Sequence, residues 1–402
     1  MNIAVAQSGG PTCAINASLM GVFKGALKEK NIDKVYGSLN GIEGVINDNF
    51  VILNDVLKTN ADIELVKQTP SSLLKSCRYK LPDVEKDEAV YKKIIETFKK
   101  HDIGAFFYIG GNDSMDTVNK VSKYFMENGV DIKVMGVPKT IDNDLPITDH
   151  TPGFGSAAKY VVATLQEIIR DCSVYNLKSV TIVEIMGRDT GWLTASSAAL
   201  RQISDLAPDL IYLPEGDFKV ANFLKDIENL HKTQNTVIVA ISEGVEPDTD
   251  ELNSTQSGVT DNFGHKYLAG VGKCLENIIR RDLGCKVRSI ELNLMQRCAS
   301  HVASKTDIEE AQAVGVAAVE AAMAGMTGKV MTFERVNEAP YTVAINATDA
   351  GNIANQVKYF PSEWINKEQN NVTDDAINYV LPLIQGELDV KYVNGIPAQF
   401  KL

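Results

Sequence analysis

The sequence predicts an α/β protein of two doubly wound domains with a functional site in the cleft between them. Short, β-branched-rich apolar runs alternate with helix-length periodic segments, the pattern of a parallel sheet covered by helices on both faces. At 402 residues the chain is long for one domain. Glycines and polar residues follow several apolar runs, and ligands bind at the carboxyl ends of strands in such folds.

Six apolar runs are expected to be strands buried on both faces, because polar residues hardly interrupt them. They span 3–6, 105–108, 133–137, 180–185, 210–213 and 236–241. Helices are expected at 14–28, 114–127, 155–172, 218–231 and 266–280. A turn-rich surface loop is expected at 244–264, a capping box at 306–309 before a helix over 310–323, and a hairpin turn at Asn394-Gly395.

Charge and hydropathy narrow the class of function. The net charge of -12 argues against nucleic acid as a partner, because phosphate backbones select for basic faces. No apolar run approaches the roughly 18 residues that span a bilayer, so no membrane partner is expected. The chain opens on a strand pattern without the basic and apolar regions of a signal peptide, so a cytoplasmic location is expected.

Two loops after predicted strands suggest phosphoryl transfer. The loop 110–114 reads Gly-Gly-Asn-Asp-Ser, and its glycines let backbone N–H groups approach an anion. The loop 138–144 reads Pro-Lys-Thr-Ile-Asp-Asn-Asp and places carboxylates beside a lysine, which suits a general base near a phosphate. Taken alone, Asp142 and Asp144 also fit a solvated turn, the glycines fit tight turns, and scattered arginines fit surface ion pairs.

Together with further motifs, these loops make the chain similar to the 6-phosphofructokinases (phosphofructokinase family A) over most of residues 1–345. Thr-Ile-Asp-Asn-Asp at 140–144 and Met-Gly-Arg at 186–188 are the most specific motifs. Gly9-Gly10, the loop 110–114, Glu243, Arg288 and Arg297 occur in the same order and approximate spacing. The resemblance implies the phosphofructokinase fold of two Rossmann-like domains. Residues 1–152 with about 298–345 would bind the phosphoryl donor, and 153–297 with about 346–402 the sugar phosphate.

The resemblance also implies site residues. Asp142 would be the base that deprotonates the 1-hydroxyl of fructose 6-phosphate, and Arg188 would hold the transferring phosphoryl group. Glu243 would accept hydrogen bonds from the sugar. Arg288 and Arg297 would grip the 6-phosphate, Arg288 in a neighbouring subunit's site, which implies a homodimer or homotetramer. The remaining implied contacts are Thr140, Ile141, Asp144, Met186 and Gly187 for the sugar phosphate, and Gly9, Gly10, Arg78, Gly111 and Ser114 for the donor.

The identity of the donor depends on two residues. In ATP-dependent members of the family, glycines stand at the positions of Asp113 and Lys139. A carboxylate at Asp113 would exclude the α-phosphate of ATP by size and by charge, and Lys139 would be a fixed cation for pyrophosphate. The resemblance is therefore to the pyrophosphate-dependent branch, and both residues are expected to contribute to catalysis.

Some positions depart from the family pattern. Asn112 stands where an aspartate usually assists Mg²⁺, so it is only a provisional ligand of the expected Mg²⁺ cofactor. Leu294 and Ser179 replace a histidine and an arginine of the phosphate grip. Three alternatives stay open: an ATP-dependent 6-phosphofructokinase, a lipid or NAD kinase with a similar glycine-rich loop, and a sugar-phosphate sensor without catalysis.

Overall fold

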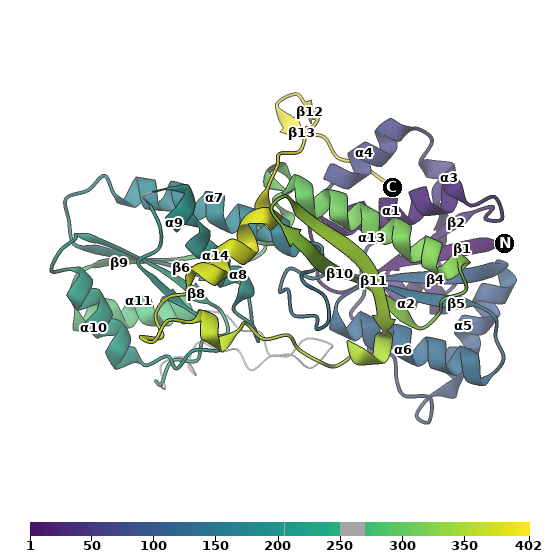
Figure 1. The fold of residues 1–402 in the computed structure, drawn as a ribbon, viewed down its shortest axis with the longest axis horizontal. Coiled ribbons are helices and arrows are strands. Elements are labelled where there is room, and N and C mark those ends of the chain that lie inside the picture. The colour runs from purple at the N-terminus through teal and green to yellow at the C-terminus, as the bar shows by residue number, and fades with distance from the viewer. Residues whose placement is uncertain (205, 250–269) are drawn as a thin grey trace.

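The computed structural model describes residues 1–204, 206–249 and 270–402. It has a seven-stranded sheet and a four-stranded sheet, each with its own covering helices, side by side along the long axis of the molecule (Figure 1). Among the described residues, no helix is long and apolar enough to cross a membrane.

The larger sheet has the order β11-β10-β5-β4-β1-β2-β3. Its parallel centre runs from β10 to β2, and antiparallel strands β11 and β3 form its two edges. Its strands are β1 (Asn2–Gln7), β2 (Val35–Ser38), β3 (Phe50–Ile52), β4 (Ile103–Gly110), β5 (Lys133–Pro138), β10 (Lys329–Glu338) and β11 (Tyr341–Asp349).

Alternation along β1 shows how helices come to cover both faces of this sheet. Ile3 and Val5 enter one apolar cluster, whereas Ala4 and Ala6 enter the cluster on the other side. The first cluster packs under α1 (Ile15–Lys28), α3 (Leu53–Val56), α4 (Asn60–Gln68) and α13 (Lys305–Met323). The second packs under α2 (Gly41–Ile46), α5 (Glu88–Lys100), α6 (Asn112–Glu127) and η3 (Ala350–Asn352).

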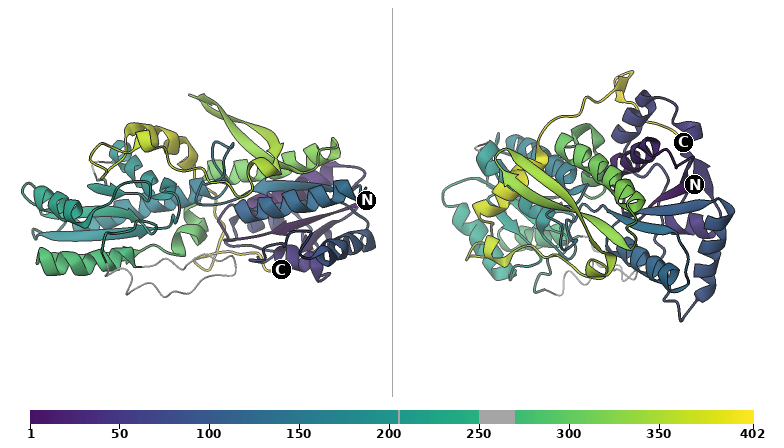
Figure 2. Two further views of the ribbon diagram at one scale, coloured as in Figure 1. Left: turned by 90° about the horizontal axis from the view of Figure 1, so that it is seen from below. Right: turned by 45° about the vertical axis from the view of Figure 1, so that its right-hand side comes forward.

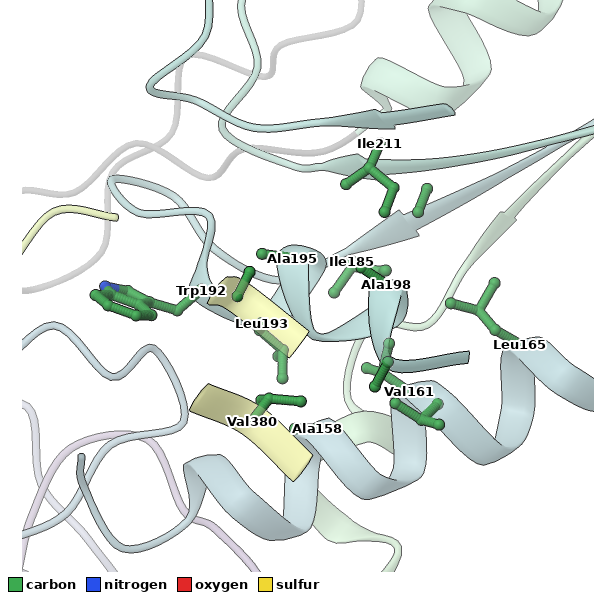
Figure 3. Close-up of a cluster of buried hydrophobic side chains, with 14 of the residues drawn as sticks. Ala158, Val161, Leu165, Ile185, Trp192, Leu193, Ala195, Ala198, Ile211 and Val380 are labelled. Carbon is green, nitrogen blue, oxygen red and sulfur yellow. The ribbon is translucent and has the colours of Figure 1, made fainter. Parts of the chain in front are cut away.

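The smaller sheet is wholly parallel and has the order β7-β8-β6-β9. Its strands are β6 (Ser179–Ile185), β7 (Leu210–Tyr212), β8 (Thr236–Ser242) and β9 (Lys286–Glu291). One face carries α10 (Val220–Leu230) and α11 (Val271–Asp282). The other carries α7 (Phe154–Cys172), α8 (Trp192–Ala195), η1 (Ser196–Ala199), α9 (Leu200–Ile203), η4 (Ser362–Trp364), α14 (Asp374–Val380) and η5 (Leu381–Ile384). Figure 3 shows the apolar core between the smaller sheet and the helices on its α7 side, with Trp192 at the edge of that core.

The six predicted strands are confirmed, as are helices matching four of the five predicted segments to within two residues at each end. The fifth predicted helix, 266–280, corresponds to α11 at Val271–Asp282, and residues 266–269 lie outside the described residues. Residues 250–264 of the predicted loop also lie outside them. The capping box at 306–309 is wrong. The helix begins at Lys305, and Ser304 caps it by accepting from the Asp307 N–H. The Asp307 carboxylate instead accepts from the Gly153 N–H and from Ser156, which ties α13 to the start of α7.

The end of the chain departs from the predicted domain division. Residues 346–349 still belong to β11, and the hairpin of β10 and β11 rises from the surface of the molecule (Figure 2). Further on, Gln68 of α4 bonds to the main chain of Lys391 and Ala398. The chain therefore packs on the second domain at α14 and returns to the first domain from about residue 391. The turn at Asn394-Gly395 is confirmed, between β12 (Tyr392–Val393) and β13 (Ile396–Pro397).

Candidate active site

A cavity of about 470 Å³ lies between the two domains at the carboxyl ends of their strands. It collects nearly every residue that the sequence predicted for the site. From the first domain these are Gly9, Gly10, Arg78, Gly111, Asn112, Asp113, Ser114, Lys139, Thr140, Ile141, Asp142 and Asp144. From the second they are Met186, Arg188, Glu243 and Arg297. Gly187 and Arg288 are the predicted residues that do not line it.

The loop after β4 leads directly into the amino end of α6. A Cβ atom at Gly110 would lie 2.0 Å from Oγ of Ser114, so only glycine fits there. Gly111, the residue before the helix, has φ of -90° and more room, with its nearest neighbour 3.6 Å from a built Cβ. The sixteen-residue helix thus presents the N–H groups of its first turn and the positive end of its dipole to the cavity, a favourable place for a phosphate.

Lys139 follows β5 and is almost completely buried. Its ammonium group donates to the carbonyl oxygen of Gly10, 2.6 Å away. Burial lowers the pKa of Lys139 to about 8, and the nearby Asp142 carboxylate limits that decrease. The lysine is therefore a fixed cation at the cavity wall near neutral pH.

Two carboxyl groups follow in the same loop. Burial raises the pKa of Asp142, opposed by the charges of Lys139 and Arg188, and burial with the charge of Asp142 raises the pKa of Asp144 to about 7. Because the two groups interact, their protons are lost as those of a pair. Thr140 accepts from the Asp142 N–H, and the Thr190 hydroxyl donates to the Asp142 carbonyl, so both domains hold this loop. A carboxylate so placed can serve as a general base near neutral pH.

The second domain contributes the turn after β6. Gly187 has φ of +140°, and a Cβ there would lie 2.5 Å from the Thr190 carbonyl oxygen, so the predicted glycine shapes the turn rather than the cavity surface. Its N–H donates to Oε1 of Glu243, 3.3 Å away. Burial raises the pKa of Glu243 to about 7. Among the described residues, Nε of Arg188 is buried without a hydrogen-bond partner, which leaves a donor for a ligand.

Cations surround the first loop as well. A Cβ at Gly10 would lie 3.1 Å from Nη1 of Arg297, so the glycine permits this arginine to approach. Burial lowers the pKa of Arg297, and the positive charge of Arg78 lowers it further. Such crowding of positive groups is costly unless an anion completes the site, and it suits a doubly anionic phosphate.

Arg288 lies elsewhere. It is exposed on the edge strand β9, at a small hollow that it shares with Tyr175 and Lys286. The cavity of the single chain thus contains Arg297 but not Arg288.

Some residues of the cavity were missed. Pro11, Thr12, Lys80, Asp189, Thr190, Asn355 and Val357 also line it. Several are close neighbours of predicted motifs, such as Thr12, two positions after Gly10. The Thr12 hydroxyl accepts from the N–H groups of Ala14 and Ile15 at the start of α1. Asn355 and Val357 carry no signal, since they come from a segment with no readable motif.

The contacts of Asn112 do not fit the role of a Mg²⁺ ligand. The amide of Asn112 already accepts from the Asn355 N–H, at 2.5 Å, and donates to the Gln356 carbonyl. Within the described part of the chain, no three His, Cys, Asp or Glu side chains gather as a metal site. Asn112 is therefore a poor ligand for the expected Mg²⁺ ion.

Two doubly wound domains sharing a cavity of carboxylates, one buried lysine and several arginines define a phosphotransferase. The family model described as phosphofructokinase matches residues 2–322, and the chain belongs to the phosphofructokinase family.

Individual relatives are similar along the whole chain. Several of them, including the two described next, are named pyrophosphate--fructose 6-phosphate 1-phosphotransferase. The protein of Halomonas elongata is 38% identical and that of Xanthomonas campestris pv. campestris 40%, each match covering 100% of this chain and 96% of the relative. The crystal structure of a pyrophosphate-dependent phosphofructokinase from Nitrosospira multiformis superposes with a TM-score of 0.88 at 35% identity, covering 100% of this chain and 96% of that one.

Proposed function

We propose that this protein reversibly transfers a phosphoryl group from pyrophosphate to the 1-hydroxyl of fructose 6-phosphate, giving fructose 1,6-bisphosphate and phosphate. The observation that carries the proposal is the pair Asp113 and Lys139 on the wall of one cavity, with Lys139 fixed to the Gly10 carbonyl. Relatives named for this reaction, similar along the full chain, support it.

The acceptor side of the reaction belongs to the 138–144 loop and the second domain. Asp142 takes the proton of the 1-hydroxyl while that oxygen attacks the nearer phosphorus of pyrophosphate, and the bond to the bridging oxygen breaks to release phosphate. Arg188 and Lys139 stabilise the charge that spreads over the transferring group. Glu243 orients the sugar hydroxyls, and Arg297 binds the 6-phosphate.

The donor side excludes nucleotides. Asp113 lies in the first turn of α6, where the helix amino end would otherwise favour a further phosphate. Its carboxylate repels the α-phosphate of ATP and occupies the space that this group needs. Pyrophosphate lacks that third phosphate, so it can bind Lys139 without repulsion between an α-phosphate and the Asp113 carboxylate.

Magnesium, the assembly and the compartment complete the proposal. Mg²⁺ would be held mainly by the oxygens of pyrophosphate, which supply the hard ligands that Asn112 does not, and would neutralise part of the donor's charge. Arg288 completes the sugar-phosphate site of a neighbouring subunit in a homodimer or homotetramer, consistent with its exposed position on β9. The enzyme acts in glycolysis, in the cytoplasm.

A coupled assay with purified protein tests the reaction. Product formation from fructose 6-phosphate is measured with pyrophosphate and, separately, with ATP, and the reverse reaction with fructose 1,6-bisphosphate and phosphate. Turnover in both directions with pyrophosphate, and little with ATP, is expected. Equal or better turnover with ATP would identify an ATP-dependent enzyme. Binding of fructose 6-phosphate without turnover on either donor would identify a sensor.

A further inference from the structure

The segment between the two domains near the chain end runs along the active site. Residues 353–360, here called the strap, leave the first domain after η3 and reach the second before η4. In Figure 1 they form part of the yellow-green trace that passes from beside α6 toward α14. Asn355 and Val357 of the strap line the cavity.

One end of the strap is tied to the donor side. Asn112, the first residue of α6, accepts from the Asn355 N–H at 2.5 Å and donates to the Gln356 carbonyl. The Asn355 amide in turn donates to Oδ1 of Asp116, one helical turn further along α6, at 3.0 Å. An aspartate at position 112 would lose the donor to Gln356, so these contacts specifically require the asparagine.

The other end is tied to the loop that holds Asp142 and Asp144. The Lys358 N–H donates to the Asp144 carbonyl at 2.7 Å. Its ammonium group donates to the carbonyl oxygens of Thr148 and Asp149, at 3.1 and 2.8 Å, and lies 3.4 Å from the side-chain oxygen of Asn143. This one lysine thus contacts the main chain or side chain of four residues between 143 and 149.

The second domain holds the strap as well. The indole N–H of Trp192 donates to the Lys358 carbonyl at 3.0 Å, and the lysine ammonium group lies 4.9 Å from the centre of the Trp192 ring. The Phe360 N–H donates to Glu215, whose carboxylate also accepts from Gly191. The strap therefore joins the start of α6, the 138–149 loop and the second domain in a continuous set of hydrogen bonds.

We propose that Asn112 and Lys358 are positioning residues, which act through the strap to fix the donor-binding end of α6 relative to the loop of the general base. The inference rests on the proposed function, because the two parts held together are those assigned to the donor and the acceptor. Such positioning matters, since a misplacement of about 1 Å can cost on the order of a hundredfold in rate. Where the family usually has an aspartate that assists Mg²⁺, Asn112 thus makes a structural contact with the strap.

Lys358→Met tests the acceptor end, because methionine is a long, unbranched side chain like lysine but removes the ammonium donors and their charge beside Trp192. We expect kcat to fall by about tenfold to a hundredfold, and Lys358→Arg, which keeps charge and donors, to recover most of that loss. Asn112→Ala tests the donor end and should raise the KM for pyrophosphate at least about fivefold, with little change in the KM for fructose 6-phosphate. Asn112→Asp should behave like the alanine variant.

A control and a double variant separate positioning from packing. Lys367→Met changes an exposed lysine of the same tail and should leave kcat and both KM values unchanged. The double variant Asn112→Ala, Lys358→Met should lose less kcat/KM than the product of the single losses, because both loosen one strap. If the variants only melt at lower temperature, with normal kinetic constants per folded molecule, the proposal is wrong. Should Lys358→Met fail to fold, Asn112→Ala decides the question by the same KM comparison.

Hydrogen exchange keeps this test separate from that of the proposed function. Peptides covering 110–116 and 143–149 should exchange faster in each positioning variant than in the wild-type protein and in Lys367→Met. This comparison needs no turnover. Unchanged hydrogen exchange in the variants would overturn the strap proposal even if the wild-type enzyme uses pyrophosphate. Faster exchange in the variants, together with a wild-type protein that uses neither pyrophosphate nor ATP, would count against the proposed function alone.

Discussion

The Lys139 ammonium group donates a hydrogen bond to the carbonyl oxygen of Gly10, with 2.6 Å between the two atoms. The residues follow β5 and β1, which are separated in the sheet by β4. Gly9 beside them has φ of +74°, and a Cβ there would lie 3.4 Å from the lysine nitrogen. The cation is thus held between two strand ends, at a position that neither loop could fix alone.

This placement predicts a narrow pH optimum. On the alkaline side, kcat/KM for pyrophosphate should fall above about pH 8, because burial lowers the pKa of Lys139 to about 8 and its charge is lost there. On the acid side it should fall below about pH 7, because Asp144 and Glu243, whose pKa values burial raises to about 7, become protonated there and weaken the site.

Lys358, whose pKa burial also lowers to about 8, titrates in the same alkaline range. Lys139→Arg distinguishes the two lysines. Arginine stays charged, so the alkaline limb should move upward if Lys139 sets it. If the alkaline limb of the pH profile does not move in Lys139→Arg, a group other than Lys139 sets it.

Asp142→Asn should reduce kcat by roughly 10² to 10⁴, because the amide cannot take the proton of the 1-hydroxyl. The KM for fructose 6-phosphate and the melting temperature should change little. Asp33→Asn, at an exposed aspartate that does not line the cavity, is the matched control and should retain full turnover. Retention of more than about a tenth of wild-type kcat in Asp142→Asn would remove Asp142 from the role of base.

Two substitutions at Asp113 separate size from charge in the exclusion of ATP. Asp113→Asn keeps the volume and removes the charge, whereas Asp113→Gly removes both. If both effects operate, kcat/KM for ATP should rise in each, by roughly tenfold or more in the glycine variant and by less in the asparagine variant. Steady-state rates with both donors provide the measurement. No gain with ATP in either variant would show that another residue selects the donor.

The glycines before α6 give a prediction on stability. Gly110→Ala should destabilise the fold by about 1 to 3 kcal/mol, because the new methyl group would lie 2.0 Å from Oγ of Ser114. Gly111→Ala should be nearly neutral, since its methyl group meets nothing closer than 3.6 Å. Denaturant unfolding of the two variants compares them directly, and an equal loss of stability at both positions would contradict this difference in packing.

Much of this site could be predicted from sequence because of how parallel sheets are built. The loops at 9–10, 110–114, 138–144 and 186–188 each follow a buried strand, and the carboxyl ends of parallel strands meet at one edge. The strands missed were mainly edge or antiparallel ones. The apolar run of β3 is only 3 residues long, and polar residues interrupt the partly exposed strands β9 and β11. The predicted capping box placed Thr306 at the start of the helix, but Ser304 caps α13, and the Thr306 hydroxyl donates to the distant Gln385 carbonyl.

The sequence by itself determined the fold class, the two loops expected to bind phosphate and the residues expected to choose the donor, because these depend on local periodicity and on motifs of a few residues. Only the tertiary structure decided that Asn112 binds the main chain of Gln356, 244 positions away, and that Lys358 holds the loop of Asp142. It also placed Arg288 outside the cavity of its own chain. Such contacts arise where two separately wound domains pack together, and no local pattern records which distant residues will meet there.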